Sequence, residues 1–328
     1  MKAAPTLNHE AHEDHEVATD PFRPSARVAP GASASVQALA AKLAGATGSL
    51  AVAHGGAWLD GRRVSDPAEV APAGALLTLR LPPDGGYPAL ELNPRDIAYE
   101  DEWLVALHKR AGWYVGATPW DVCDNALAAL GRYLAARDGA APPVHLAHQL
   151  DRDSSGVLLL SKAPAANAPL QAAFAGGRVN KRYLGLCTGV PTWATTELRT
   201  GHGRSAGGRW RIYPLEEVGR VLPQGGGRVR VAHTTFVVAG RLADAALVRA
   251  TLHTGRTHQI RLHMAHAGHP LLGDARYGGP TRYGGRDLPG HLLHAAELHL
   301  AHPITGAPLD LASPLPELFQ ALLDLGGA

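Results

Sequence analysis

The sequence predicts an α+β fold whose main sheet is mixed and mainly antiparallel. Short apolar runs typical of strands follow one another along residues 95–328, with only a few helical segments between them. That order is expected of a mainly antiparallel sheet rather than of alternating β-α units. Hydrophobic residues make up 45% of the 328 residues and charged residues 18%, which is enough for a substantial core. The length fits one large domain or a main domain with a small appendage.

The first 28 residues are predicted to form a disordered tail. This segment is polar, contains His9, His12 and His15, and has no apolar stretch of the signal-peptide type. Histidines on such a tail would bind a metal ion only adventitiously.

Residues 29–82 predict a small α/β module. Val36–Ala44 has the composition of a helix and is followed by Gly45, a common helix stop. Asp60-Gly61 predicts the turn of a β-hairpin, and Leu76–Leu81 a closing strand. This order resembles the small RNA-binding domain first known from ribosomal protein S-four. The helix departs from that pattern, because Lys42 is its only cation.

Residues 83–94 are predicted to be a linker, and residues 95–328 the main domain. Strands are expected at residues 103–107, 157–160, 183–186, 234–238 and 246–252. One helix is expected over Ala165–Phe174, before Gly176-Gly177, and another over Thr257–Ala267, before Gly268.

The most informative segment is a charged turn at residues 148–156, His-Gln-Leu-Asp-Arg-Asp-Ser-Ser-Gly, which precedes the apolar run 157–160. That run predicts a fully buried strand. The turn before it would be held rigidly and could present a reactive carboxylate, Asp151. The alternative is that Asp151 only satisfies local backbone amides, as aspartates in turns commonly do.

Three further segments favour the reactive interpretation. They are Lys-Arg-Tyr at residues 181–183, Thr-Gly-Arg-Thr-His-Gln-Ile-Arg-Leu-His at 254–263, and Gly-His-Pro-Leu-Leu-Gly-Asp at 268–274. With residues 148–156, they resemble in content and order the motifs of the RluA-type pseudouridine synthases. The resemblance runs from about Arg95 to Phe319. It implies an α+β catalytic domain with a central cleft across the sheet.

The resemblance also implies an activity, the isomerisation of a uridine in structured RNA (ribosomal or transfer RNA) to pseudouridine without a cofactor. Asp151 matches the catalytic aspartate, Tyr183 the tyrosine that stacks on the target base, and Arg261 the arginine expected to pair with the aspartate. An arginine partner would keep Asp151 ionised when RNA covers it. Arg256 and Arg261 are five apart, so only one of them would face Asp151 if both were helical.

Six residues are predicted to contact RNA. They are Lys109, Gln149, Arg152, Lys181, Arg182 and Arg256. For Lys109 the capping of a strand end stays an open alternative. Gln149 stands where the family usually has the arginine expected to enter the RNA stack, and glutamine has neither the charge nor the stacking surface of a guanidinium. Asp274 is expected to satisfy turn amides, and His148 and His294 to be hydrogen-bonded structural groups.

Charge and composition limit the alternatives. The net charge of +2 is small, but residues 199–230 contain seven arginines against two acids, which would suit a phosphate backbone. No apolar segment approaches the ~20 residues that span a bilayer, so no membrane association is expected. Two cysteines give no disulfide framework, and a reducing cytoplasm follows as the simplest location.

Two rival functions are also consistent with parts of the sequence. A metal-dependent hydrolase is suggested by the many histidines between 253 and 269, but the H-E-x-x-H pattern is missing and no acid lies among them, so no metal site is expected. An RNA-binding protein that kept the fold and lost the reaction stays open because of Gln149. The expected state is a monomer whose partner is RNA.

Overall fold

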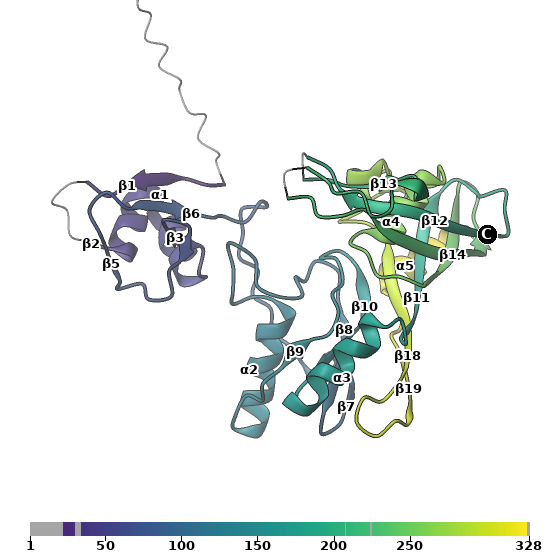
Figure 1. Cartoon of the computed structure of the whole chain (residues 1–328), viewed down its shortest axis with the longest axis horizontal. Coiled ribbons are helices and arrows are strands. Elements are labelled where there is room, and N and C mark those ends of the chain that lie inside the picture. Colours follow the sequence, from purple (N-terminus) through teal and green to yellow (C-terminus); the bar gives the residue numbers. More distant parts are fainter. Residues whose placement is uncertain (1–21, 30–33, 207, 224, 327–328) are drawn as a thin grey trace, which may run out of the picture. The chain divides into compact units, whose positions relative to one another are not determined.

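The structure is a computed structural model and describes residues 22–29, 34–206, 208–223 and 225–326. The described residues form two compact units (Figure 1). The first comprises the chain up to Tyr87 together with Thr118–Val122, and the second comprises Pro88–Ala117 and the chain from Cys123 onward. The sequence did not predict that residues 118–122 return to the first unit. Most of the predicted tail, residues 1–21, lies outside the described residues.

The first unit is built around a four-stranded sheet of order β1-β6-β3-β4. Its strands are β1 (Ser25–Arg27), β3 (Ala57–Leu59), β4 (Arg62–Arg63) and β6 (Leu76–Leu79), and β2 (Ala34–Ser35) pairs separately with β5 (Val70–Ala71). The predicted hairpin turn is confirmed: Asp60 and Gly61 both have positive φ, 46° and 82°. Strand β1 corrects the predicted tail, because it pairs with β6 and Val28 is buried after it.

The helix of this unit, α1 (Val36–Ala53), consists of two segments separated by non-helical residues Ala44 and Gly45. The predicted stop at Gly45 is therefore real, but a second helical segment follows it. By length and mean hydropathy (18 residues, 1.3) α1 could cross a membrane. This is weak evidence, because the helix is interrupted at its centre and buries Val36, Ala40 and Ala51 in the core of the unit.

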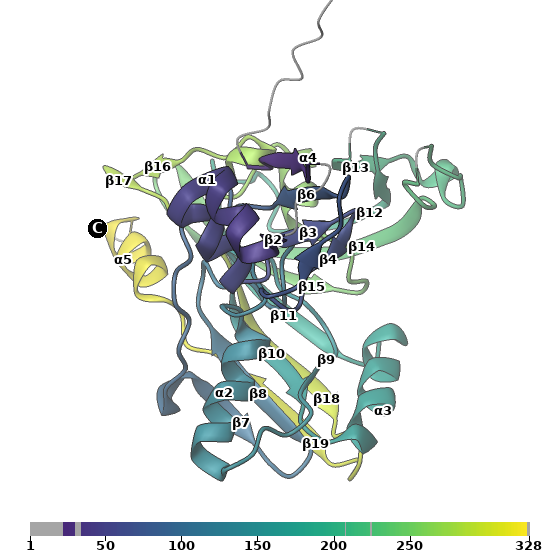
Figure 2. The same cartoon turned by 90° about the vertical axis from the view of Figure 1, so that its left-hand side faces the viewer.

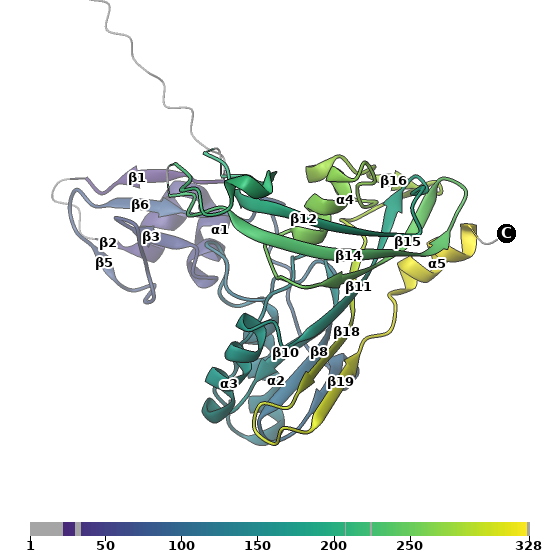
Figure 3. The same cartoon turned by 45° about the vertical axis from the view of Figure 1, so that its right-hand side comes forward.

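The second unit contains an eleven-stranded sheet of order β13-β12-β14-β15-β11-β18-β10-β8-β7, with β19 paired to β18 and β9 to β10. Its strands are β7 (Ile97–Glu100), β8 (Leu104–Lys109), β9 (His145–Leu146), β10 (Ser155–Ser161), β11 (Asn180–Thr188), β12 (Thr195–Arg204), β13 (Trp210–Tyr213), β14 (Arg230–Arg241), β15 (Ala245–Leu252), β18 (Leu293–Ala301) and β19 (Pro308–Ala312). Only β10 and β18 pair in parallel; every other pairing is antiparallel. This confirms the predicted α+β class and all five predicted strands. The long strands β12, β14, β15 and β11 lie side by side in Figure 3.

Four helices accompany this sheet (Figure 2). They are α2 (Ala126–Asp138), α3 (Pro164–Ala175), α4 (Gln259–His266) and α5 (Glu317–Gly326). Helix α2 shares a core with Leu107 and Leu158, whereas α3 shares one with Ala106 and Leu159. Because neighbouring strand residues point to opposite faces, the two helices cover opposite faces of β8 and β10. Strands β8 and β10 are therefore buried on both faces. Helices α3 and α4 confirm the two helices predicted for residues 165–174 and 257–267.

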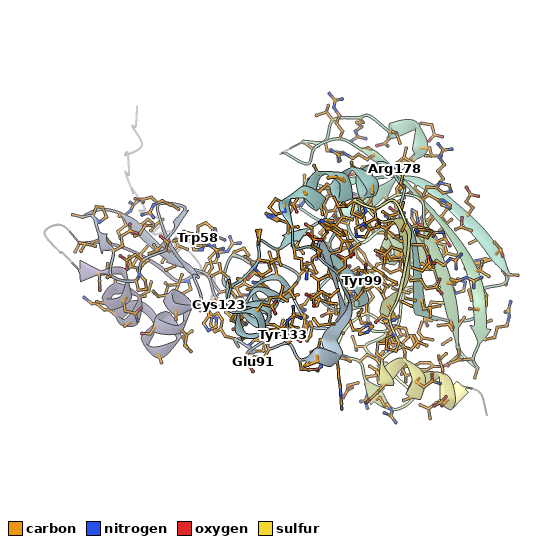
Figure 4. The ribbon with its side chains drawn as sticks, turned by 90° about the horizontal axis from the view of Figure 1, so that it is seen from below. Trp58, Glu91, Tyr99, Cys123, Tyr133 and Arg178 are labelled. Carbon is orange, nitrogen blue, oxygen red and sulfur yellow. The ribbon has the colours of Figure 1, made fainter. Side chains whose placement is uncertain are left out.

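The turn between β7 and β8 is closed by one carboxylate. Asp101 accepts hydrogen bonds from the backbone amides of Trp103 and Leu104 at 2.8 and 2.7 Å, and from the Tyr99 hydroxyl at 2.6 Å. Tyr99 is labelled in Figure 4. This bond raises the pKa of Tyr99 to about 12, with burial adding to the effect. The turn thus fixes the start of β8, the strand that carries Lys109.

Candidate active site

Asp151 lies in the loop between β9 and β10, and the ammonium group of Lys109 fastens that loop. Lys109 Nζ donates to the carbonyl oxygens of Arg152 and Ser154, both at 2.7 Å, and of Arg110 at 3.1 Å. Lys109 is only 2% exposed, and burial lowers its pKa to about 7. The prediction of an RNA contact is therefore corrected. A buried ammonium that satisfies three carbonyls positions the Asp151 loop and has no access to phosphate.

This correction makes a testable prediction. Lys109→Met leaves three carbonyls without their donor, so we expect the free energy of unfolding to fall by about 2–4 kcal/mol. Turnover should fall with it, because the Asp151 loop loses its anchor, while the affinity for RNA stays within about twofold. Thermal unfolding and RNA titration measure the two effects. A large loss of RNA affinity in a protein of unchanged stability would instead support a direct contact between Lys109 and RNA.

The loop leads into β10 at Gly156, where only glycine fits. Gly156 pairs with Ala295 of β18 in parallel and has a φ of +115°. A Cβ at Gly156 would lie 2.2 Å from the carbonyl oxygen of Ala295. The end of the motif at residues 148–156 is thus explained by the close approach of two strand backbones.

Arg261 joins two carboxylates. From α4 it donates Nη1–H to Asp151 Oδ2 at 2.9 Å. Its Nε and Nη2 donate to the two oxygens of Asp274 at 2.7 and 2.8 Å. The Tyr277 ring lies against its guanidinium, 5.0 Å from the carbon to the ring centre. Arg261 is 7% exposed and Asp274 2%, so the geometry at this position is fixed.

Asp274 therefore corrects another prediction, since its side chain holds Arg261 rather than turn amides. Burial alone would lower the pKa of Arg261, but its hydrogen bonds to the carboxylates and their charges outweigh burial and raise it. Arg261 keeps its charge, and Asp274 fixes the direction in which the guanidinium meets Asp151.

Tyr183 belongs to β11 and is 8% exposed. Burial raises the pKa of its hydroxyl, and the charge of Asp151 adds to the shift. The ring thus remains a neutral phenol. Its neighbour Arg182 points to the other face of β11 and pairs with Glu297 at 2.9 Å.

Two histidines near Asp151 were not assigned from the sequence. His258 Nε2 lies 3.8 Å from Asp151 Oδ1, and His291 Nε2 lies 3.9 Å from Asp151 Oδ2. His258 shares a 2.7 Å hydrogen bond through Nδ1 with the Tyr277 hydroxyl, and His291 shares a 2.9 Å bond with Ser154 Oγ. Burial is the main reason that the pKa of His258 falls to about 4 and that of His291 to about 2. Both rings are neutral at pH 7.

Little in the sequence pattern points to these positions of the two histidines. His258 is the N-cap of α4 with a positive φ of 57°, a backbone feature that no side-chain pattern reports. His291 lies in a loop without periodicity. His148 and His294, by contrast, are structural as predicted: His148 Nε2 accepts from the Leu159 amide at 2.9 Å, and His294 Nε2 donates to the Ser313 carbonyl at 3.0 Å.

Of these groups, Asp151, Tyr183, His258 and Arg261 line a pocket of about 560 Å³. Six of the predicted site residues line it: Gln149, Asp151, Lys181, Tyr183, Arg256 and Arg261. Gln149 is exposed, and burial lowers the pKa of Lys181, with Arg256 adding to the shift. Arg152 and Arg182 lie outside the lining. Arg152 pairs with Asp153 at 2.7 Å. For these two residues RNA contact stays a prediction.

The pocket thus combines a carboxylate–guanidinium pair, an aromatic ring and two further cations. The family model for RNA pseudouridylate synthase matches residues 103–266, which contain most of this site. The chain belongs to the RluA-type RNA pseudouridine synthases. It is therefore an isomerase that acts on RNA.

Relatives and solved structures agree with this. The chain is 38% identical over 258 residues to RNA pseudouridine synthase 1 of Oryza sativa, covering 67% of this chain and 72% of the relative. It is 32% identical to ribosomal large subunit pseudouridine synthase D of Pseudomonas aeruginosa, covering 82% and 85%. The solved human RNA pseudouridylate synthase domain containing 4 has the same fold, with a TM-score of 0.56 at 24% identity over 70% of this chain and 92% of that one.

Proposed function

We propose that Asp151 is the catalytic carboxylate of this synthase and that Arg261 and Tyr183 complete the reacting site. The observation that carries the proposal is the 2.9 Å bond between Asp151 and a buried Arg261 at the wall of the pocket. A desolvated carboxylate stays ionised only beside a matched cation. Arg261 provides that cation and is itself held by Asp274.

The reaction sets the demands on these residues. The glycosidic C–N bond of uridine breaks, the uracil turns, and a carbon of the ring is joined to the sugar. The proton on that carbon leaves, and the freed nitrogen receives one, so no redox partner is needed. Asp151 acts at the sugar or in the proton transfer. Tyr183 supplies a flat, neutral surface that holds the uracil while it turns.

The target uridine must leave its stack to reach Asp151. Lys181 and Arg256 line the pocket and would bind the phosphates on either side of the flipped nucleotide. Gln149, exposed at the pocket, would take the place that the base vacates. Its amide can hydrogen-bond an orphaned base but cannot stack on it.

We further propose that the RNA is ribosomal, because several relatives are named as ribosomal large subunit enzymes. Transfer RNA is the second candidate. A cytoplasmic location fits Cys123 and Cys187, which are thiols and are not joined in a disulfide. The experiment maps pseudouridine in total RNA from cells with and without the gene. Sites that vanish, and return with the wild type, would identify the target.

The alternative is an RNA-binding protein with weakened catalysis, and the observation in its favour is Gln149. Mapping that finds no lost site, together with tight binding of purified protein to RNA, would select it. A direct comparison is Gln149→Arg, for which we expect equal or up to about tenfold higher turnover. Single-turnover rates on the mapped RNA measure this. A large loss would give Gln149 a dedicated role of its own.

A further inference from the structure

A second pocket of about 290 Å³ lies directly beside the active-site pocket. The two pockets share one wall, the segment 255–257 between β15 and α4. The other side of the second pocket comes from β12, β13, the connection between β13 and β14, and the first residue of β14. Of the residues that line it, the proposed function uses only Arg256.

An aromatic platform forms one side of it. The Trp210 ring stacks on the imidazole of His202, with ring centres 5.0 Å apart and an interplanar angle of 28°. His202 is 3% exposed, and its Nε2 donates to the Thr257 carbonyl at 2.8 Å. Burial lowers the pKa of His202, so the ring stays neutral. The indole is thus fixed to the shared wall and is itself only half-buried.

Three arginines line the same pocket. Arg228 donates Nη1–H to the Gly219 carbonyl and Arg256 donates Nε–H to the Val231 carbonyl, both at 3.0 Å. Each guanidinium keeps further N–H groups for a ligand. Among the residues that the structure describes, Arg228, Arg230 and Arg256 have no ion-pair partner. Burial, and then the charge of Arg230, lower the pKa of Arg256, and a bound anion would relieve that repulsion.

An aromatic ring beside unpaired guanidinium groups is the chemistry that binds one nucleotide of single-stranded RNA. Bases stack on the ring, and phosphate oxygens accept from the guanidinium groups. The position decides which nucleotide this is. Arg256 lines both pockets, so a phosphate held there would join the base in one pocket to the base in the other.

We infer that this pocket is a subsite for an unpaired nucleotide that flanks the target uridine, with its base on Trp210 and its phosphate at Arg256 and Arg230. The inference rests on the proposed function, since it assumes that the uridine occupies the Asp151 pocket. With this subsite the protein would bind a second nucleotide besides the target uridine. That neighbouring nucleotide must then also be unstacked. Target choice then depends on a loop or bulge at least two nucleotides wide.

The test uses the full-length protein and an RNA fragment that contains a site modified by the wild type. Trp210→Ala is expected to raise KM about tenfold, the loss of one base–aromatic stack, with a much smaller change in kcat. Trp210→Phe keeps a ring and should retain most of the affinity. Arg230→Ala is expected to raise KM and weaken its salt dependence, whereas Arg282→Ala, which removes an arginine paired with Asp287 on an exposed hairpin, should not.

The RNA is varied in parallel. An abasic nucleotide on one side of the uridine should raise the KM of the wild type as much as Trp210→Ala does, and should add little more to that variant. The subsite would be overturned if the increases in KM from the abasic nucleotide and from Trp210→Ala added in full when combined. It would also be overturned if Trp210→Ala had the KM of the wild type. Failure of the proposed function would give a different result, because the wild type would then form no pseudouridine in any RNA.

Discussion

Asp151→Asn is expected to reduce pseudouridine formation at least 10⁴-fold, on the order found when the central group of a catalytic constellation is removed. Asparagine has nearly the same shape and can still accept a hydrogen bond from Arg261, so the loop and the pocket persist. It has no charge to stabilise the sugar and a carbonyl that is a poor nucleophile and base. The RNA, held by cations elsewhere, should bind with a Kd within about threefold of the wild type.

Single-turnover assays and RNA titration of the same preparation measure both effects. The matched control is Asp287→Asn, which removes a carboxylate from the exposed hairpin of β16 (Arg282–Tyr283) and β17 (Arg286–Asp287). It should leave turnover and binding unchanged. Wild-type turnover by Asp151→Asn would exclude Asp151 as the catalytic carboxylate. Lost RNA binding in a folded protein would move its role to recognition.

The sequence was informative where a feature of the fold depends on residues that are close together along the chain. Gly61 and Gly176 mark a turn and a helix end, and the apolar run 157–160 marks a strand buried on both faces. These features depend on neighbours along the chain, so local patterns report them. Five strands of the second unit (β8, β10, β11, β14 and β15) and helices α3 and α4 followed from such patterns.

Strand β18 was not predicted, because its conformation depends on pairing with strands that are distant along the chain. Its sequence, Leu-His-Ala-Ala-Glu-Leu-His-Leu-Ala, is composed largely of residues that favour helices. It is a strand because β10 and β11 provide hydrogen bonds on its two sides. Tertiary context therefore overrides propensity. Helix α2 was also not predicted, although its sequence holds local signals for both ends: Asn125 caps its start, and Gly139, in a left-handed conformation, ends it.

At the site, the motifs identified which residues assemble but not what each one does. Lys109 and Asp274 both belong to family motifs, and both act on another residue of the site rather than on RNA. A sequence cannot distinguish an exposed cation from one that is 2% exposed and bound to three carbonyls. That distinction depends on how β8 and the Asp151 loop pack, which is long-range information.

Asp274→Asn tests the most important of these long-range contacts. Arg261 would lose the carboxylate that receives two of its three hydrogen bonds. The asparagine oxygen could accept only one of them, and Asp151 would be the one charged partner left to the buried guanidinium. Breaking a buried ion pair from one side costs about 3–5 kcal/mol. We expect the free energy of unfolding to fall by an amount of this order, and turnover to fall about 10²-fold as Arg261 loses its fixed direction.

The two losses can be separated. Assayed well below its melting temperature, Asp274→Asn should be folded, bind RNA normally and show the loss in kcat rather than in KM, because Asp274 does not line the pocket. Asp244→Asn serves as the control, since Asp244 accepts a hydrogen bond from Tyr283, makes none of the three bonds to Arg261 and lies outside the pocket lining. If Asp274→Asn loses stability yet keeps wild-type kcat, Arg261 does not need a fixed direction. The catalytic role proposed for the bond between Arg261 and Asp151 would then fall, because a guanidinium free to turn away would serve equally well.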